Sequence, residues 1–446
     1  MTHAAENLGK SLHFAATMSR LMLANTAAAS EVVRAIIAIT EHDGLQGVRA
    51  DVTYNQIVIT YRDVYGKPHV WIEAIPGRDF NFGSYTELAR LLDDYLVART
   101  LTLDEALARV HALEHATPRY GTGVIRLICG VAGALVAVIF GAGWLAAGVA
   151  FVANIVVHWV FTILGARRWP SFFLQIISGF TAALSAAVVV AVHPTADGSQ
   201  VVVAVIMIML AGMTSTGAVQ DLLTGWYLTG TGRLIEAFVN TIGLIVGVQL
   251  GMRILALADI HLTVGSDVDV APHPVWVMLI AATLTACSFC IVAGLRLQAM
   301  PAAAVLTCGT WFSFYLLSQF GADAVWASGV AALFAGLVSP VLGGLMRIPA
   351  ANLASIAIIL MFPGLLLYRG LLSWGTDIND GITLLLQALS TAMALAIGVM
   401  FGQYLTSEVA GFLTRARRHP STFLPHFLRP FRARPEKELI RTCPPL

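Results

Sequence analysis

The sequence predicts a polytopic α-helical membrane protein that carries a small α+β domain at its N-terminus. Of its 446 residues, 57% are hydrophobic and 12% are charged, whereas a globular domain is about 25% charged. The charges are also uneven, because residues 1–121 hold 25 of them and residues 122–406 only 17. This composition excludes a single soluble domain and a disordered chain. The net charge of +1 provides no field that would attract nucleic acid.

The N-terminal residues 1–121 alternate between helical and extended patterns. Apolar side chains recur at helical spacing from Leu12 to Thr40, but the segment is too charged to cross a membrane. Apolar and polar residues alternate over the next segments, as they do in half-buried strands. Thr102 followed by Glu105 forms a capping-box pattern at a helix start. We therefore expect one helix over 12–40, a pair of strands over 48–62, a third strand over 70–75, and two further helices over 85–98 and 102–115.

The middle of the chain contains ten apolar segments. A membrane-spanning helix needs about 20 apolar residues, and residues 122–406 have room for about ten such helices. The expected domains are a cytoplasmic α+β domain over 1–121, two five-helix repeats over 122–258 and 259–406, and a basic tail over 407–446. The expected spans are 123–141, 143–164, 171–193, 200–219, 233–257, 274–295, 299–318, 324–343, 350–372 and 383–405.

The arginines indicate how the chain is oriented in its membrane. Connections on the side of the N-terminal region collect most of the arginines in the membrane part, and the opposite side holds only Arg253 and Arg369. Positively charged loops stay in the cytoplasm. We therefore predict a multi-pass inner-membrane protein with both termini in the cytoplasm. The basic tail suits contact with anionic lipid.

The two halves of the membrane part show an internal repeat. Residues 221–224 (Asp-Leu-Leu-Thr) align with 370–373 (Gly-Leu-Leu-Ser), and Gly232 aligns with Gly381, both at an offset of 149. The run Gly247–Gly251 resembles Gly398–Gly402. Because each half has five spans, the two halves would have opposite orientations in the membrane. Such inverted repeats are a recurring transporter architecture, with binding sites near the interface of the repeats.

The segment from Gly212 to Asn240 is the most probable site of chemistry, because apolar spans do not need so many glycine and threonine residues. Glycines and hydroxyls suit a broken helix whose free backbone groups line a cavity. Charged groups at membrane depth usually face a cavity or a partner. We therefore assign substrate binding and proton coupling to three residues: Asp221, Arg233 and Glu236. Four more residues are expected to line the cavity or break the helix: Thr224, Gly225, Gly230 and Gly232. The alternative is a solvated cytoplasmic loop.

Two other places in the membrane part carry polar or helix-breaking residues. In the second half, Pro363 and Gly364 indicate a break in an apolar segment, and Arg369 follows them. In the second span, Asn154 and His158 are four residues apart and so lie on one helix face. Histidine titrates near neutral pH, so this pair is a candidate proton relay. The other interpretation of the pair is a hydrogen bond between helices.

A zinc site is the one alternative that points to an enzyme. The run His111-Ala-Leu-Glu114-His115 matches the H-x-x-E-H pattern of one peptidase class, but a third ligand would have to come from elsewhere. Cys287 and Cys290 lack the two further ligands that a zinc site requires. The chain contains no phosphate-binding G-x-x-x-x-G-K-[ST] motif. We therefore expect a transporter without metal or cofactor.

The chain resembles the threonine/serine exporter family over nearly its whole length. The resemblance rests on Glu87–Leu91 and Leu103–Leu107 in the N-terminal region, on ten spans in two halves, and on the run from Gln220 to Glu236. It implies export of threonine and serine from the cytoplasm, driven by the proton gradient. Within the motif, the resemblance extends to four residues: Asp221, Gly225, Arg233 and Glu236. The first helix departs from the family pattern at Asn25–Ala27, which leaves its role open.

The predicted function is therefore secondary active export of small amino acids by alternating access. Its substrate would be a zwitterion, since the candidate cavity carries both signs of charge. Some relatives move a dicarboxylate such as succinate, so dicarboxylate export is an alternative. Alternatives of other classes are a membrane-embedded zinc hydrolase and a membrane-anchored sensor. The expected partners are the amino acid, protons and membrane lipid, and a homo-oligomer is compatible with the sequence.

Overall fold

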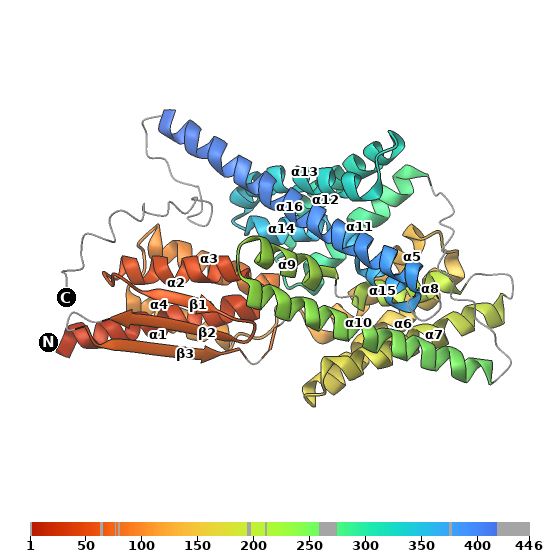
Figure 1. Ribbon diagram of the computed structural model, residues 1–446, viewed down its shortest axis with the longest axis horizontal. Helices are drawn as coiled ribbons and strands as arrows, with labels where there is room; N and C mark the ends of the chain where they lie inside the picture. The colour runs from red at the N-terminus through yellow and green to blue at the C-terminus, as the bar shows by residue number, and fades with distance from the viewer. Residues whose placement is uncertain are drawn as a thin grey trace.

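The chain folds into an elongated molecule with an N-terminal domain at one end and a bundle of apolar helices at the other (Figure 1). The computed structural model describes residues 2–62, 66–75, 77–78, 81–193, 198–209, 212–257, 274–373 and 377–416. The bundle is called the membrane part below. Most of the expected basic tail, from residue 417 onward, and the expected boundary between the two halves at 258–259 lie outside the described residues.

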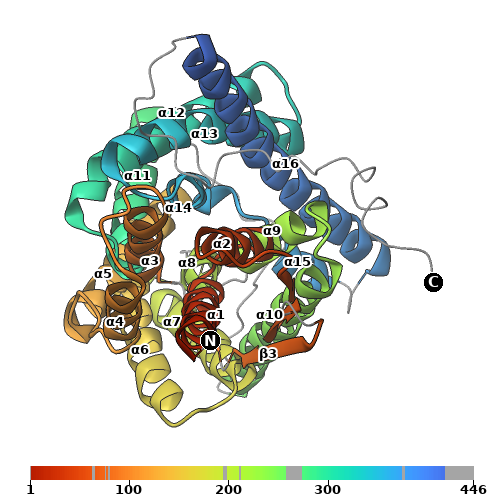
Figure 2. The ribbon, with the colours of Figure 1, turned by 90° about the vertical axis from the view of Figure 1, so that its left-hand side faces the viewer.

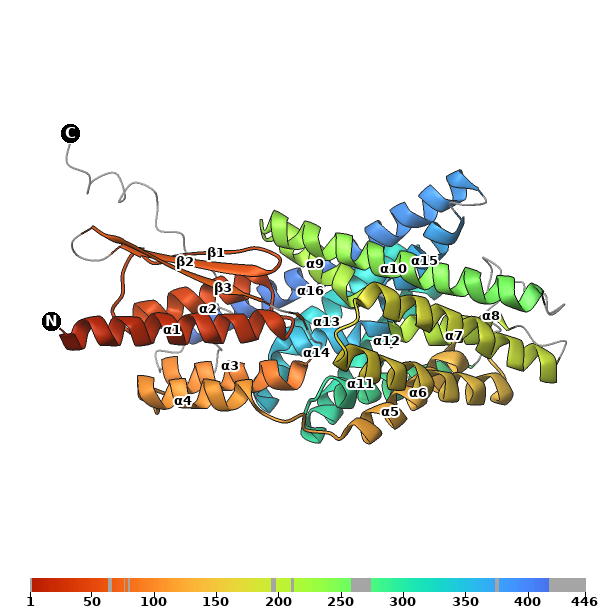
Figure 3. The ribbon, with the colours of Figure 1, turned by 90° about the horizontal axis from the view of Figure 1, so that it is seen from below.

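The N-terminal domain has three layers, in which α1 and α2 lie between a small sheet and the pair α3 and α4 (Figure 3). The strands form an antiparallel sheet in the order β1-β2-β3, and Ile57 and Ile59 of β2 are buried against the helices. Thr102 and Glu105 form the expected capping box. The elements are α1 (Thr2–Ala24), α2 (Ala29–His42), β1 (Arg49–Val52), β2 (Gln56–Arg62), β3 (Pro68–Ala74), α3 (Phe82–Leu96) and α4 (Leu103–Glu114).

The helix expected over 12–40 is in fact two helices. Residues 25–28 interrupt it, and Thr26 has a left-handed φ of 75°. The apolar spacing continues on both sides of the turn, because α1 and α2 pack against each other and share one core. The prediction of a single helix was therefore wrong, and the reversal between α1 and α2 becomes important at the site described below.

The membrane part contains twelve α-helices among its described residues. Eight helices are long and apolar enough to cross a membrane, and a ninth span results if the bent segment of α14 and α15 is counted as one. The ten continuous spans of the prediction are therefore not all present. The helices are α5 (Thr122–Ile139), α6 (Trp144–Ala166), α7 (Ser171–Val192), α8 (Ser199–Met209), α9 (Gly212–Leu223), α10 (Tyr227–Ala256), α11 (Val275–Val292), α12 (Met300–Gln319), α13 (Ala324–Met346), α14 (Ala350–Ala357), α15 (Gly364–Ser373) and α16 (Ile378–Ala416).

The fourth and ninth expected segments are the ones that differ from simple spans. The fourth, expected over 200–219, consists of α8 and α9, which flank residues 210–211 outside the described residues. The ninth bends by 53° between α14 and the following residues, where a 3₁₀ turn (Ile359–Met361) and Pro363 precede α15. The described bend therefore lies in the segment of the second half that corresponds to α8 and α9 in the first half.

Corresponding helices pack against each other in the two halves. In the first half α7 packs on α10 and α5 on α6, and in the second half α13 packs on α16 and α11 on α12. Contacts between the halves also correspond, because α9 touches α16 and α15 touches α10. Figure 2 shows α11 to α13 on one side of the bundle and α6, α7 and α10 on the other, with the N-terminal domain across the end of both groups.

Glycines let the helix backbones approach closely in two pairs, α7 with α10 and α13 with α16. A methyl group on Gly247 of α10 would lie 1.9 Å from the carbonyl oxygen of Ile176 in α7. A methyl group on Gly398 of α16 would lie 2.4 Å from the carbonyl oxygen of Gly329 in α13. Small residues at such crossings let helix backbones approach in membrane proteins. The two glycine runs aligned in the sequence thus occupy equivalent helix crossings.

Large apolar side chains cover the outside of the bundle, as lipid contact requires. The exposed ones include Trp144, Trp276 and Trp326, which are between 64% and 92% exposed. Each lies in the first turn of a helix, α6, α11 or α13. Aromatic side chains of this kind gather at the boundary between lipid and water. The outer surface of the helical bundle is therefore typical of a membrane protein.

Candidate functional site

The run singled out in the sequence forms the turn between α9 and α10. Gly225 has a φ of +89°, a conformation that favours glycine, and the chain reverses there. Thr224 closes the end of α9 by donating from its hydroxyl to the carbonyl oxygen of Gln220 at 2.9 Å. The expected break is therefore at Gly225. Gly230 and Gly232 do not break the helix, since both lie inside α10.

Gly230 and Gly232 instead allow close packing. A methyl group on Gly230 would lie 2.8 Å from the carbonyl oxygen of Ala218 in α9, and one on Gly232 would lie 2.8 Å from the side chain of Tyr54. Tyr54 belongs to the turn between β1 and β2 of the N-terminal domain. Gly230 and Gly232 were expected to line the cavity or to break the helix. They serve helix packing instead, because both lie inside α10 and neither is among the residues that line the cavity described below.

Asp221 and Arg233 form a buried ion pair across this turn. The Asp221 Oδ2 and Arg233 Nη1 atoms are 2.7 Å apart, and the two side chains are 0% and 7% exposed. Asp221 Oδ1 accepts a hydrogen bond from the backbone N–H of Ala29 at 3.0 Å. Arg233 Nη2 donates to the carbonyl oxygen of Ala27 at 3.1 Å. The pair therefore holds the turn between α1 and α2, so it joins the membrane part to the N-terminal domain.

Glu236 lies one turn further along α10, beside Tyr54 and Arg78 of the N-terminal domain. Burial, together with the charge and hydrogen bond of Glu236, raises the pKa of Tyr54 to about 12. The Arg78 guanidinium lies 4.6 Å from the centre of the Tyr54 ring, and Arg78 Nη2 donates to the Tyr54 carbonyl oxygen at 2.6 Å. Burial, assisted by the charge of Arg233, lowers the pKa of Arg78 to about 10. Glu236 is thus the carboxylate of a small charged cluster.

A cavity of about 1010 Å³ lies between the N-terminal domain and the membrane part. One wall comes from α2 and α3 and includes Ser30, Glu31, Arg34, Tyr85, Arg90 and Asp93. The opposite wall comes from both halves of the membrane part and includes Thr216, Gln220, Arg233, Glu236, Asn352 and Gln403. The cavity therefore adjoins α9 and α14, which belong to the fourth and ninth expected segments, and it carries charges of both signs.

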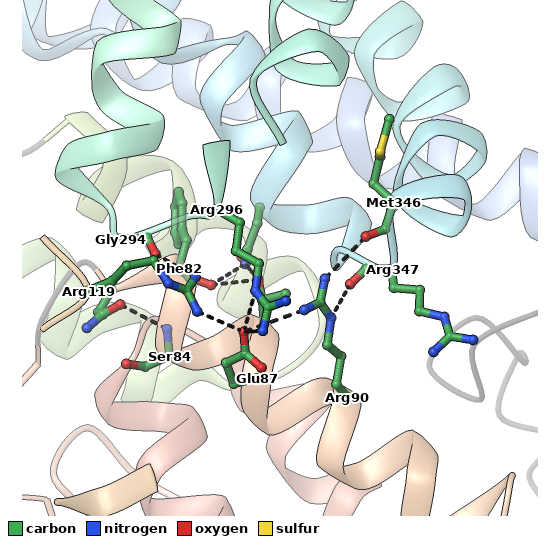
Figure 4. A network of polar contacts seen from close by, with 12 residues as sticks. Phe82, Ser84, Glu87, Arg90, Arg119, Gly294, Arg296, Met346 and Arg347 are labelled. Carbon is green, nitrogen blue, oxygen red and sulfur yellow. Dashed lines mark hydrogen bonds and ion pairs between the residues drawn. The ribbon is translucent and has the colours of Figure 1, made fainter. Parts of the chain in front are cut away.

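The N-terminal domain also contacts the second half, through Glu87 of α3 (Figure 4). Glu87 Oε1 accepts from Arg296 at 3.0 Å, from Arg119 at 3.2 Å and from Arg90 at 3.5 Å. These side chains are partly exposed. Arg90 also donates to the carbonyl oxygen of Arg347 at 3.0 Å. Burial lowers the pKa of Arg90, and the other nearby arginines act in the same direction.

Asn352 of α14 adds a buried contact to the same interface. Its Nδ2 donates to the carbonyl oxygen of Phe82 at 3.3 Å and to the hydroxyl of Thr86 at 3.4 Å. Gly83 of α3 donates from its backbone N–H to the carbonyl oxygen of Ala293 at 2.9 Å. The start of α3 therefore rests on α14 and on the connection that follows α11.

The remaining predicted residues lie away from the cavity wall. Pro363 and Gly364 mark the start of α15, and Arg369 lies half-buried within that helix. Asn154 is fully buried in α6, where its Nδ2 donates to the carbonyl oxygen of Ala150 at 2.9 Å. His158 lies half-buried one turn further on. The proton relay at His158 and Asn154 stays a prediction.

The structure gives the candidate zinc residues other contacts. Glu114 forms an ion pair with Arg20 at 2.6 Å, and His111 Nδ1 lies 3.5 Å from the same carboxylate. Among the residues that the structure describes, no three histidine, cysteine or acidic side chains gather as a metal site would require. The zinc hydrolase alternative therefore has no support here.

Sequence reasoning missed the part that α3 plays. Glu87, Arg90 and Asp93 are three residues apart and so lie on one face of this helix. That spacing was a usable signal, because a charged face on an otherwise amphipathic helix next to the membrane part needs partners. Arg34 of α2 was missed for another reason, since nothing in its neighbourhood along the chain indicates that α2 borders a cavity.

Comparisons with known proteins agree with the architecture. The sequence model described as "Putative threonine/serine exporter" matches residues 13–255, and the one described as "Threonine/Serine exporter, ThrE" matches residues 278–405. The chain is 28% identical over 427 residues to a protein named threonine/serine exporter from Corynebacterium glutamicum, covering 93% of this chain and 84% of that protein.

A second relative, named "Probable threonine/serine exporter", comes from Mycobacterium tuberculosis (strain ATCC 25618 / H37Rv). It is 27% identical over 418 residues, which cover 90% of this chain and 77% of the relative. No solved structure matches the chain. The family is one of transporters and not of enzymes. Since the first sequence model alone matches more than half of the chain, the protein belongs to the threonine/serine exporter family.

Proposed function

We propose that the protein exports threonine and serine from the cytoplasm by proton-coupled alternating access. The observation that carries this proposal is the cavity of about 1010 Å³ between the N-terminal domain and both halves of the membrane part. A cavity bounded by two similar halves is the arrangement in which transporters hold their substrates. Hydroxyl, amide and charged side chains line it, and these suit a small zwitterion that carries a hydroxyl group.

The two halves act as inverted repeats in this proposal. Support comes from the shared helix neighbours and from the equivalent glycine crossings at Gly247 and Gly398. Interrupted spans leave backbone groups available to a substrate or an ion. Rocking of one half against the other would expose the cavity first to one side of the membrane and then to the other.

The N-terminal domain marks the cytoplasmic side. Arg119, Arg296 and Arg347 all lie beside this domain, in keeping with the rule that arginine-rich connections remain in the cytoplasm. An exporter loads its substrate from the cytoplasm. The cavity in this structure would therefore be the loading site.

The three predicted site residues take different roles in this proposal. Asp221 and Arg233 position the N-terminal domain, because four of their polar atoms are engaged with each other and with backbone groups. Glu236 lines the cavity, beside Tyr54 and Arg78. We assign proton coupling to Glu236, since a cavity-facing carboxylate can bind and release a proton in each cycle.

Counterflow in proteoliposomes tests the function. Purified protein is reconstituted into vesicles loaded with threonine, serine or succinate, and uptake of the labelled compound is followed with and without a pH gradient. Flux of threonine and serine that responds to the gradient is the expected result. Flux of succinate alone would instead assign the protein to dicarboxylate export. Amino-acid flux that ignores the gradient would remove proton coupling from the proposal.

A further inference from the structure

Two charged side chains on the cavity wall differ from all the others. Arg34 of α2 and Asp93 of α3 both line the cavity, and neither side chain has a hydrogen bond or ion pair among the described residues. The charges that act here are that of Arg347 on Asp93 and that of Arg34 on Tyr85. The Nε atom of Arg34 is also buried without an acceptor. An unpaired donor inside a protein costs free energy unless something binds it. These two side chains are therefore open to a ligand.

The neighbouring charges are already occupied. Glu31 accepts a hydrogen bond from the Tyr85 hydroxyl at 2.8 Å, and Asp94 pairs with Arg109 at 3.7 Å. The remaining occupied charges are those of Glu87 and its arginine partners, of the Asp221–Arg233 pair, and of the cluster around Tyr54. The open pair thus consists of one cation and one anion, without an excess of either sign.

The packing of α2 on α3 fixes how far apart the two side chains are. Tyr85 donates to Glu31 near the start of both helices, and Tyr95 donates to Asp43 near the end of both. The helices therefore run in the same direction, and Arg34 and Asp93 lie between these two contacts. With a rise of 1.5 Å per residue, their offset along the helix direction is about 7 to 8 Å counted from the first contact and about 10 to 11 Å counted from the second. An α-amino acid with its two hydrogen bonds spans a similar length.

The environment of Asp93 suits a cationic ligand. Burial, together with the charge of Asp94, raises the pKa of the Asp93 carboxyl to about 6, although the charge of Arg347 acts in the opposite direction. A carboxylate that is desolvated and unpaired gains more from a bound ammonium group than an exposed one does. The guanidinium group of Arg34 offers the complementary donors for a carboxylate.

We propose that Arg34 and Asp93 form a binding site for a zwitterionic α-amino acid on the N-terminal domain. Arg34 binds the α-carboxylate, and Asp93 binds the α-ammonium group. This inference rests on the proposed function, because it assigns the first contact of the exported amino acid to the domain outside the membrane. It also explains why the cavity wall retains two opposite charges that do not pair with each other.

Binding to the full-length protein in nanodiscs tests the site. The probes are L-threonine, L-threoninamide, which lacks the carboxylate, and N-acetyl-L-threonine, which lacks the ammonium group. Asp93→Asn and Arg34→Gln should each weaken threonine binding by about 10-fold or more, since each removes a charged hydrogen bond. The Asp93→Asn variant should no longer bind threonine more tightly than N-acetyl-L-threonine. The Arg34→Gln variant should no longer bind threonine more tightly than L-threoninamide.

Matched control variants separate the site from a general effect of charge. Arg49→Gln and Asp51→Asn alter exposed side chains of β1 that do not line the cavity, and both should bind threonine as the wild type does. Unchanged threonine affinity in folded Arg34→Gln and Asp93→Asn would overturn the proposal. So would an equal loss of affinity for all three probes. If the wild type binds threonine but does not transport it, the proposed function fails and the site stands.

Discussion

Asp221 and Arg233 come from two successive helices of the membrane part, yet their ion pair of 2.7 Å is completed by backbone groups of the N-terminal domain. Each residue contacts one side of the turn between α1 and α2, at Ala29 and Ala27. The attachment of the domain to the first half is therefore buried and charged. The attachment to the second half differs, because it includes ion pairs between Glu87 and partly exposed arginines.

Breaking the buried pair should weaken the whole molecule. Asp221→Asn leaves Arg233 without its counter-charge, and such a loss costs about 3 to 5 kcal/mol. We expect a markedly lower melting temperature in detergent and faster proteolysis of the N-terminal domain. The double variant Asp221→Asn/Arg233→Gln should lose less free energy of unfolding than the two single variants lose together. Asp104→Asn is the control, since it removes a largely exposed ion pair with Lys10 worth at most about 1 kcal/mol. Equal effects at both sites would contradict the anchoring role.

Glu236 offers a way to separate exchange from proton coupling. Glu236→Gln keeps the shape of the side chain and its place beside Tyr54 but cannot bind and release a proton. We expect threonine counterflow without a gradient to continue at a rate similar to that of the wild type. Accumulation driven by a pH gradient should fall at least about 10-fold, a change of roughly 1.4 kcal/mol. Full gradient-driven accumulation in this variant would assign the coupling to another residue.

The Glu87 cluster should respond to salt, because exposed ion pairs are screened. Hydrogen exchange of α3 and of residues 293–299 should speed up in the wild type as salt is raised. Glu87→Gln should show the faster exchange already at low salt, with a loss of stability of about 1 kcal/mol or less. The variant should then respond little to further salt. Exchange that is independent of salt in the wild type would show that Asn352 and the backbone contacts hold this interface alone.

The close helix crossings predict paired effects of two glycine substitutions. Gly247→Ala and Gly398→Ala would each place a methyl group within 2.4 Å of a carbonyl oxygen on the facing helix. Overpacking of this kind costs about 1 to 3 kcal/mol or more, so both variants should melt earlier than the wild type. Gly148→Ala in α6, where no atom lies within 4 Å of the added methyl group, should melt as the wild type does. A large effect in one half and none in the other would argue against equivalent crossings.

The raised pKa of Asp93 has a measurable effect on stability. The carboxyl binds its proton more tightly in the folded chain, with a pKa of about 6 against the ordinary 3.8. Its contribution to stability is therefore complete below about pH 4 and is lost as the pH rises through 6. Asp93→Asn should remove this component, so the difference in melting temperature from the wild type should shift in favour of the variant between pH 4 and pH 7. A constant difference over that range would contradict the raised pKa.

The sequence predicted those features that depend on local spacing. The capping box at Thr102, the strands of the N-terminal domain and the apolar segments of the membrane part follow from patterns a few residues long. The turn at Thr26 was missed because the helical spacing continues through it. Gly230 and Gly232 were misread because glycine in a sequence does not show whether it unwinds a helix or accommodates a neighbour.

The site was predictable only in part, for a related reason. Asp221, Arg233 and Glu236 stood out as charges in an apolar region, which is a signal that composition alone provides. Their partners are backbone groups of Ala27 and Ala29 and the side chain of Tyr54, all more than 150 residues away in the sequence. Arg34 and Asp93 are ordinary charges in a soluble region, and only the folded chain shows that they lack partners.

The contact of the N-terminal domain with both halves has a consequence for inhibition. Because the domain touches the first half at Asp221 and Arg233 and the second half at Glu87 and Asn352, the halves cannot change their separation without straining or releasing one of these contacts. In the proposed alternating-access cycle, a molecule that fastens the domain to both halves would therefore stop transport without entering the membrane.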